Sequence, residues 1–136
     1  MTHTDPTDFI RGAMPLCATL DISAVALAPD RVELTMPWAA ERCTSNGILH
    51  GGALMALADA AGGTCAYFNL PDGASGTSTI ESKTNFLGAV AEGTVVATAT
   101  PLHLGSTTMV IETELRAGDR LVAKVTQTQA VLRPRT

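Results

Sequence analysis

The longest apolar segment of the chain runs from Gly52 to Phe68 and predicts one buried helix. It contains no proline, and Asp59 is its only acidic or basic residue. Its larger apolar side chains recur at helical spacing: Leu54, Leu57, Ala61 and Phe68. Asn69, which suits a left-handed cap, and Pro71 follow, so the helix is expected to end there.

Asp59 is expected on a side of this helix that carries small residues. At about 100° per residue it lies roughly opposite Leu57. The other positions on its face are Gly52, Met55, Ala56, Gly62, Gly63 and Ala66. Each glycine within a helix costs roughly 1 kcal/mol of helix propensity. The Gly62-Gly63 pair therefore indicates that another backbone or a ligand comes close to this face.

The segments around this helix predict a short helix and several strands. A helix is expected at residues 7–17, capped by Asp5 or Thr7, followed by a hairpin of strands 19–28 and 31–36. Four more strands are expected at residues 77–87, 94–104, 107–116 and 120–132. In the first of these four, Ile80, Ser82, Thr84 and Phe86 alternate with Thr79, Glu81, Lys83 and Asn85. The short links imply antiparallel neighbours.

These elements predict an α+β fold in which an antiparallel sheet of five to six strands wraps around one long helix. A length of 136 residues fits a single domain that spans residues 1–136. One helix cannot cover both the face and the edges of such a sheet. We therefore expect the chain to form oligomers through a sheet edge or a sheet face.

Composition and charge exclude several classes of partner. Apolar residues make up 46% of the chain and charged residues 16%, as in packed globular proteins. The net charge of −4 and the lack of a basic stripe argue against a nucleic-acid partner. No apolar run approaches the ~20 residues that a membrane span needs. The N-terminal segment is acidic and lacks a signal-peptide layout, so a cytoplasmic location is expected.

Several familiar kinds of site are also disfavoured. The cysteines are odd in number and widely spaced, which predicts free thiols: Cys17, Cys43 and Cys65. His50, Asp59 and Glu81 lack a recognised ligand spacing, so no metal is expected. The glycines match no dinucleotide or P-loop motif, so no cofactor is expected. There is no G-x-S-x-G motif, and Ser45 near His50 is more simply a turn residue than part of a triad.

The start of the long helix is a candidate site for a developing negative charge. The helix begins just after His50-Gly51-Gly52, where the first backbone N–H groups have no intrahelical partner. Such groups can donate to a carbonyl oxygen that gains negative charge. Spacing alone is equally consistent with His-Gly-Gly as a plain turn and with Asp59 as a structural or exposed residue.

His50-Gly51-Gly52, with Asp59 nine positions after His50, resembles the hotdog-fold acyl-CoA thioesterases, in particular the phenylacetic-acid-degradation (PaaI-like) branch. The similarity covers nearly the whole chain, including the strand that contains Thr79. It implies a homodimer, often paired into a dimer of dimers, with active sites at the subunit interface. It further implies that the Gly51 N–H polarises the thioester carbonyl and that Asp59 of the other subunit attacks it or activates a water. His50 would support the loop and contact the thioester region, and Thr79 would orient the water.

Two positions depart from the family pattern. Relatives commonly carry an asparagine six residues before the histidine, where this chain has Thr44, and Asn46 stands four before it. Either Asn46 takes that role or the contact is missing. Relatives also often place a basic residue after the glycine that we assign to Gly105, but Ser106 follows here. Another basic group would then bind the phosphates of coenzyme A, and the candidates are Arg133, Arg135, Lys83 or a residue of the neighbouring subunit.

The favoured hypothesis is an acyl-CoA thioesterase that releases a carboxylic acid and free coenzyme A. Its expected catalytic residues are Asp59, Gly51 and His50, and its expected substrate-binding residues are Asn46, Thr79, Gly105 and Ser106. A non-catalytic acyl-CoA binding or sensing module on the same fold stays open, although a binder has little reason to keep a charge on an apolar helix. A hydratase is disfavoured because those relatives carry other acid-base groups. With 4% aromatic residues, the sequence is consistent with both an aryl and an aliphatic acyl group.

Overall fold

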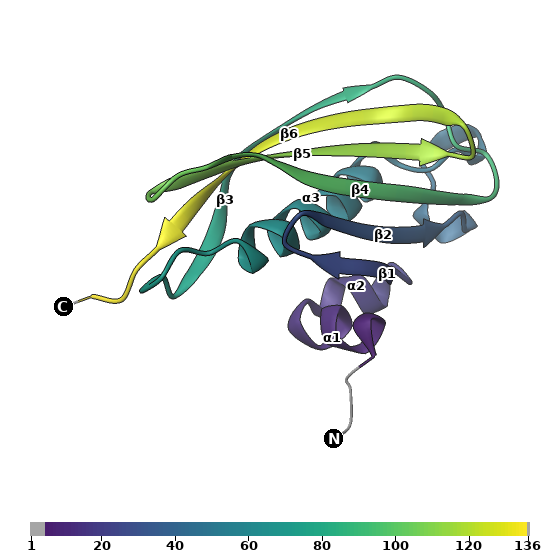
Figure 1. Cartoon of the computed structure of the whole chain (residues 1–136). Coiled ribbons are helices and arrows are strands. Elements are labelled where there is room, and N and C mark those ends of the chain that lie inside the picture. The colour runs from purple at the N-terminus through teal and green to yellow at the C-terminus, as the bar shows by residue number, and fades with distance from the viewer. Residues whose placement is uncertain (1–4, 136) are drawn as a thin grey trace.

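The computed structural model describes residues 5–135, and it has one antiparallel sheet curved around the helix α3 (Gly51–Phe68) (Figure 1). Residues 1–4 and 136 lie outside this description, including part of the acidic N-terminal segment. The strand order is β1-β2-β4-β5-β6-β3, so β1 and β3 are the edges. The strands are β1 (Ser23–Ala28), β2 (Arg31–Pro37), β3 (Gly76–Phe86), β4 (Thr94–Leu104), β5 (Thr108–Ala117) and β6 (Arg120–Leu132). The expected α+β fold is confirmed, and the sheet has six strands where five to six were predicted.

The core lies between α3 and the inner face of the sheet. Of the expected apolar stripe, Leu54, Leu57 and Ala61 are buried, and Phe68 is half-buried. The buried surface of the helix is wider than this stripe, because the curved sheet also covers Gly62 and Ala66. The expectation that these two residues share an open face with Asp59 was therefore wrong. The exposed side of α3 is a narrower strip: Gly52, Met55, Asp59 and Tyr67, with Ala56 and Gly63 half-buried.

The N-terminal segment forms two short helices instead of the one expected at residues 7–17. These are α1 (Pro6–Ala13) and α2 (Pro15–Thr19). Pro15 has no N–H to donate and restricts the residue before it, and Met14 accordingly adopts extended angles of φ −129° and ψ 91°. Asp5 is confirmed as the cap of α1, since its side chain accepts from the N–H groups of the first turn. Because α2 extends to Thr19, β1 begins later than predicted.

The C-terminal end of α3 is capped by a side chain. Asn69 has φ −111°, so the expected left-handed cap was wrong. Its Nδ2 donates to the Cys65 carbonyl at 2.8 Å and to the Pro29 carbonyl at 2.6 Å. The amide thus satisfies a carbonyl of the last turn, which would otherwise lack a partner, and ties the helix to the turn between β1 and β2.

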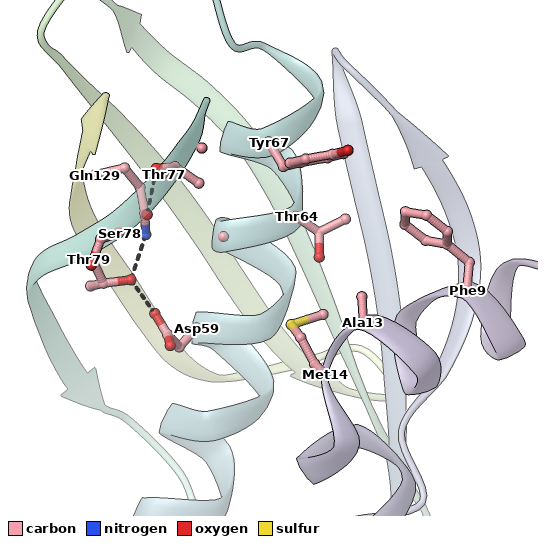
Figure 2. Close-up of a pocket in the computed structure, with 12 residues that line it drawn as sticks. Phe9, Ala13, Met14, Asp59, Thr64, Tyr67, Thr77, Ser78, Thr79 and Gln129 are labelled. Atoms are coloured by element: carbon pink, nitrogen blue, oxygen red, sulfur yellow. Dashed lines mark hydrogen bonds between the residues drawn. The ribbon is translucent and has the colours of Figure 1, made fainter. Parts of the chain in front are cut away.

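A β-bulge in β3 changes which residues of that strand face the helix. The register of β3 against β6 shifts between Thr79 and Glu81, so Ile80 is an extra residue. The predicted alternation therefore reverses at this point, and Thr79 lies on the same face as Ser82 instead of opposite to it. Bulges often redirect a side chain next to a functional site, and this one directs Thr79 toward α3, as Figure 2 shows.

Candidate active site

Asp59 lies on the wall of a cavity of about 510 Å³ between α1, α3 and the beginning of β3 (Figure 2). One side of the cavity is mainly apolar and is formed by Phe9, Ala13 and Met14 from α1 and the residue after it. The opposite side carries the carboxylate and the hydroxyl groups of β3. Such a cavity can take an uncharged group and present it to one ionisable side chain.

Two side chains hold one oxygen of the Asp59 carboxylate. The Thr79 hydroxyl donates to Asp59 Oδ1 at 2.7 Å, and the Gln127 Nε2 donates to the same oxygen at 3.0 Å. Within residues 5–135, Oδ2 has no hydrogen-bond partner. The carboxylate is therefore fixed by its inner oxygen and leaves the other oxygen available.

A second layer of hydrogen bonds supports Thr79. Its hydroxyl oxygen accepts from the Gln129 Nε2 at 2.7 Å, and the Gln129 Oε1 accepts from the Thr77 hydroxyl at 3.0 Å. Both glutamines are buried, with exposed fractions of 0% for Gln127 and 1% for Gln129. Neither glutamine was predicted from the sequence as a site residue. Their spacing could have indicated a buried role, because Gln127 and Gln129 follow Val125 at every second position of β6 and so lie on the strand face that points into the core.

Gly62 leaves room for the side chain of Gln127. A Cβ built on Gly62 would overlap the carboxamide of Gln127. Close approach to this glycine was expected, but the group that approaches is a side chain of the same chain, not a backbone or a ligand. Gly63 has open space around its Cβ position and lines the cavity.

Alanine substitutions at these two adjacent glycines are expected to act in opposite directions. Gly62→Ala should lower the free energy of unfolding by about 1–3 kcal/mol because the added methyl displaces the Gln127 amide. Gly63→Ala should raise it by about 0.5–1 kcal/mol through helix propensity. Urea unfolding of both variants tests this. Equal stabilisation by the two substitutions would show that Gln127 does not occupy this space.

His50 is the N-cap of α3. Its Nδ1 accepts a hydrogen bond from the Gly52 N–H at 2.7 Å, which fixes the start of the helix. The Gly51 N–H has no acceptor within the described part of the chain. A Cβ on Gly51 would lie 3.0 Å from the ring of Phe86, so this position has little space for a side chain. The N–H groups of Gly52, Ala53 and Leu54 bond to His50, so in the first turn of α3 the Gly51 N–H is the one left free to bind a ligand.

Gly51 and Asp59 cannot act on the same atom within one chain. They are eight residues apart on one helix, which corresponds to about 12 Å along its axis. A carbonyl group held by the Gly51 N–H must lie within about 3–3.5 Å of the group that attacks it. The two groups can therefore act on one carbonyl group only if they come from different copies of the chain.

Of the four expected substrate-binding residues, which are all within residues 5–135, Thr79 alone lines the cavity. Thr79 lies beside the carboxylate, as described above. Asn46 is exposed in the short turn before α3, with φ 67°. Gly105 lies in the turn between β4 and β5, where its N–H donates to the Thr108 carbonyl at 2.9 Å. Asn46 and Gly105 are thus outside the lining of the cavity in the same chain.

The basic candidates for phosphate binding differ in their contacts. The Arg133 guanidinium donates to the carbonyl of Ser106 at 3.0 Å and to that of Asp72 at 3.2 Å. Lys83 donates to the Asn85 side chain at 2.8 Å, and Arg135 is exposed. Arg133 thus links the C-terminal end of β6 to the turn that contains Ser106.

The buried cysteines are poor nucleophiles. Burial, reinforced by the negative charge of Asp30, raises the pKa of the Cys65 thiol to about 11. Burial also raises the pKa of Cys17, against the opposing effect of Arg11. Since the thiolate is the reactive form, both groups remain protonated at neutral pH. All three cysteines are free thiols, as predicted.

Within residues 5–135, no group of three histidine, cysteine, aspartate or glutamate side chains is arranged to hold a metal ion. In the same part of the chain, no helix has the length and apolar character needed to cross a membrane.

The sequence and the fold both match known thioesterases. Residues 46–124 match the family model described as the thioesterase superfamily. This chain belongs to the thioesterase superfamily. It is 33% identical over 117 residues to a Vibrio cholerae protein named as an esterase, covering 85% of this chain and 77% of that protein. It is 33% identical over 96 residues to the 1,4-dihydroxy-2-naphthoyl-CoA hydrolase of Escherichia coli, covering 71% and 70% of the two chains.

A solved structure supports the same assignment for this thioesterase-superfamily member. The crystal structure of a thioesterase from Haemophilus influenzae superposes with a TM-score of 0.87 at 27% identity, covering 98% of this chain and 93% of that chain. The hotdog fold is therefore confirmed, and the chain is a thioester hydrolase. This family assignment favours the enzyme over the non-catalytic binding module.

Proposed function

We propose that the protein is an acyl-CoA thioesterase whose active site is shared between two copies of the chain. The observation that carries this proposal is the placement of Asp59 on a cavity wall, about 12 Å along α3 from the free Gly51 N–H. The relative from Escherichia coli is named for hydrolysis of a CoA thioester. The finer assignment to the phenylacetic-acid-degradation branch stays a prediction.

In the proposed reaction, the Gly51 N–H of the partner subunit donates to the thioester oxygen. Asp59 then acts in one of two ways. It attacks the carbonyl carbon and forms a mixed anhydride, which water later hydrolyses, or it takes a proton from a water that attacks the carbon. In both cases the carbon–sulfur bond breaks and the thiolate takes up a proton that the attacking water supplies, directly or through Asp59, so the products are a carboxylic acid and coenzyme A. The backbone N–H stabilises the negative charge on oxygen during the attack.

The order of residues on α3 supports an antiparallel pair of helices. If Asp59 of one copy lies next to Gly51 of the partner subunit, the reverse contact also forms by symmetry, and the two-fold axis passes near the midpoint, Met55. Met55 lies on the exposed strip of α3, with an exposed fraction of 36%. The small residues Gly52 and Ala56 beside it would allow the two helices to approach closely.

The edge strand β3 fits the same arrangement. Thr79 contacts Asp59, whereas Phe86 packs against Gly51. An antiparallel pair of β3 strands centred on Lys83, with Ile80 skipped as the bulge, would place Thr79 of one copy opposite Phe86 of the partner subunit. The same symmetry thus aligns the strand and the helix. Exposed apolar side chains near this edge would be covered: Ile80, Phe86 and Leu87, with exposed fractions of 61%, 50% and 58%.

The acyl group would occupy the cavity beside Asp59, and coenzyme A would extend toward the partner subunit. Gly105, Ser106 and Asn46 stay candidates for contacts with coenzyme A, because they lie outside the cavity of their own chain. The pairing of two dimers and the cytoplasmic location also stay predictions. A panel of aryl and aliphatic acyl-CoAs, with release of free thiol as the readout, tests the proposed activity. Tight binding of every member without turnover would contradict it.

Met55→Glu is expected to abolish both the dimer and the activity. Two carboxylates would face each other at the proposed two-fold axis, whereas in the single chain the side chain is partly exposed and can tolerate a charge. We expect a folded monomer by sedimentation and circular dichroism, with turnover close to background. A monomeric variant with wild-type turnover would show that one chain suffices for catalysis.

A further inference from the structure

We propose that Gln127 and Gln129 are positioning residues that hold the Asp59 carboxylate with Oδ1 occupied and Oδ2 free to react. This inference rests on the proposed function, in which Asp59 is the reactive group. It goes beyond that function by selecting which oxygen acts and by naming the side chains that select it. Both glutamines come from β6: Gln127 contacts Asp59 directly, and Gln129 contacts it through Thr79 of β3.

Three hydrogen bonds connect Thr77 to Asp59 through Gln129 and Thr79, and in each of them the donor is the residue farther from Asp59. A threonine hydroxyl has a single proton to donate. The Gln129 Oε1 accepts the proton of the Thr77 hydroxyl, so its Nε2 faces Thr79 as a donor. Because Thr79 accepts from that amide, its own proton is left for Asp59 Oδ1. The ionised carboxylate can only accept, so Thr79 must be the donor, and Gln129 occupies the lone-pair side of the Thr79 hydroxyl and holds its proton toward Asp59 Oδ1.

Gln127 supplies the second donor to the same oxygen. Its Nε2 lies 3.0 Å from Asp59 Oδ1, whereas its Oε1 is buried and has no hydrogen-bond partner within residues 5–135. A buried oxygen without a partner destabilises the fold. An apolar side chain of similar length would remove this cost, and Gly62 would still provide the space. The contact with Asp59 is the one benefit that the structure shows for a glutamine at this position.

Together the two donors leave one oxygen of the carboxylate for chemistry. With Thr79 and Gln127 both on Oδ1, rotation of the carboxylate would break two hydrogen bonds at once. Oδ2 therefore keeps one orientation relative to the cavity. Preorganisation of this kind affects the chemical step more than substrate binding, since Gln127 lies outside the cavity lining and Gln129, although it lines the cavity, is only 1% exposed.

Methionine substitutions at the two positions separate this role from a purely structural one. We expect Gln127→Met and Gln129→Met to lower kcat about 10–100-fold with KM within about twofold. Gln127→Met should also unfold at the same or a higher urea concentration, because the unpaired oxygen is gone. Thr128→Val, on the outer face of the same strand, is the matched control and should keep wild-type kinetics.

The outcome is interpretable even if one variant fails to fold. Thr77→Val removes only the hydroxyl that orients Gln129, and it should lower kcat in the same direction. Wild-type kcat in the folded glutamine and Thr77 variants would overturn the positioning role. A fall in kcat that in every variant accompanied a fall in the free energy of unfolding would also overturn it. Combining Gln129→Met with Asp59→Asn should lower the residual turnover no further. If Asp59→Asn alone kept wild-type turnover, the proposed function would fail instead.

Discussion

Asp59→Asn is expected to lower kcat by about 10³-fold while acyl-CoA binding is retained. Asparagine has the same shape, and its Oδ1 can still accept from Thr79 and Gln127. The change replaces Oδ2 by an amide nitrogen, which can neither attack a carbonyl carbon nor take a proton from water. The loss should therefore appear in kcat, with little change in the free energy of unfolding.

Turnover of this variant can be measured as thiol release from an acyl-CoA panel, and binding by titration calorimetry. Thr128→Val is a suitable control because Thr128 lies on β6 between Gln127 and Gln129, on the face of the strand that points away from Asp59. Wild-type turnover by Asp59→Asn would show that the carboxylate takes no part in the reaction. Loss of binding together with turnover would instead place Asp59 in substrate binding.

Gly51→Pro is expected to lower kcat by about 10²–10³-fold, because proline removes the N–H that would hold the thioester oxygen. The substitution suits the backbone. Gly51 is the first residue of α3, where proline is tolerated, and the preceding His50 has φ −63° and ψ 135°, which a following proline permits. Helix formation should therefore survive while the proposed donor is lost.

Gly51→Ala is the matched control for this change. Both substitutions place a Cβ about 3.0 Å from the Phe86 ring, but alanine keeps the N–H. The ratio of kcat between the two variants thus measures the donor separately from crowding. If alanine and proline reduced kcat equally, the effect would come from the displaced Phe86 ring and the role of the N–H would be wrong.

The sequence predicted most of the elements because their signals are local. The long helix, its single charge and the glycines at its start are visible within residues 50–68, although α3 begins at Gly51 and not after Gly52 as expected. The break at Met14 also had a local signal, since Pro15 follows it directly. The helix prediction for residues 7–17 gave too much weight to the apolar spacing.

The parts that the sequence did not predict depend on contacts between distant residues. The bulge at Ile80 exists only relative to the register of β6, and it moves Thr79 onto the helix-facing side. Gln127 reaches Asp59 across 68 positions of sequence. The reason for Gly62 lies in that same contact, so a glycine that suggested a close helix partner instead makes room for a side chain.

Mixing two inactive variants tests most directly whether the site is shared between subunits. When Asp59→Asn and Gly51→Pro chains are co-expressed, each mixed dimer contains one site with an intact Asp59 and an intact Gly51, and one site with both defects. We expect activity to return to about a quarter of wild type, because about half of the dimers are mixed and each has one working site. Activity that stayed at the level of the separate variants, with mixed dimers confirmed by native mass spectrometry, would contradict a site built from two chains.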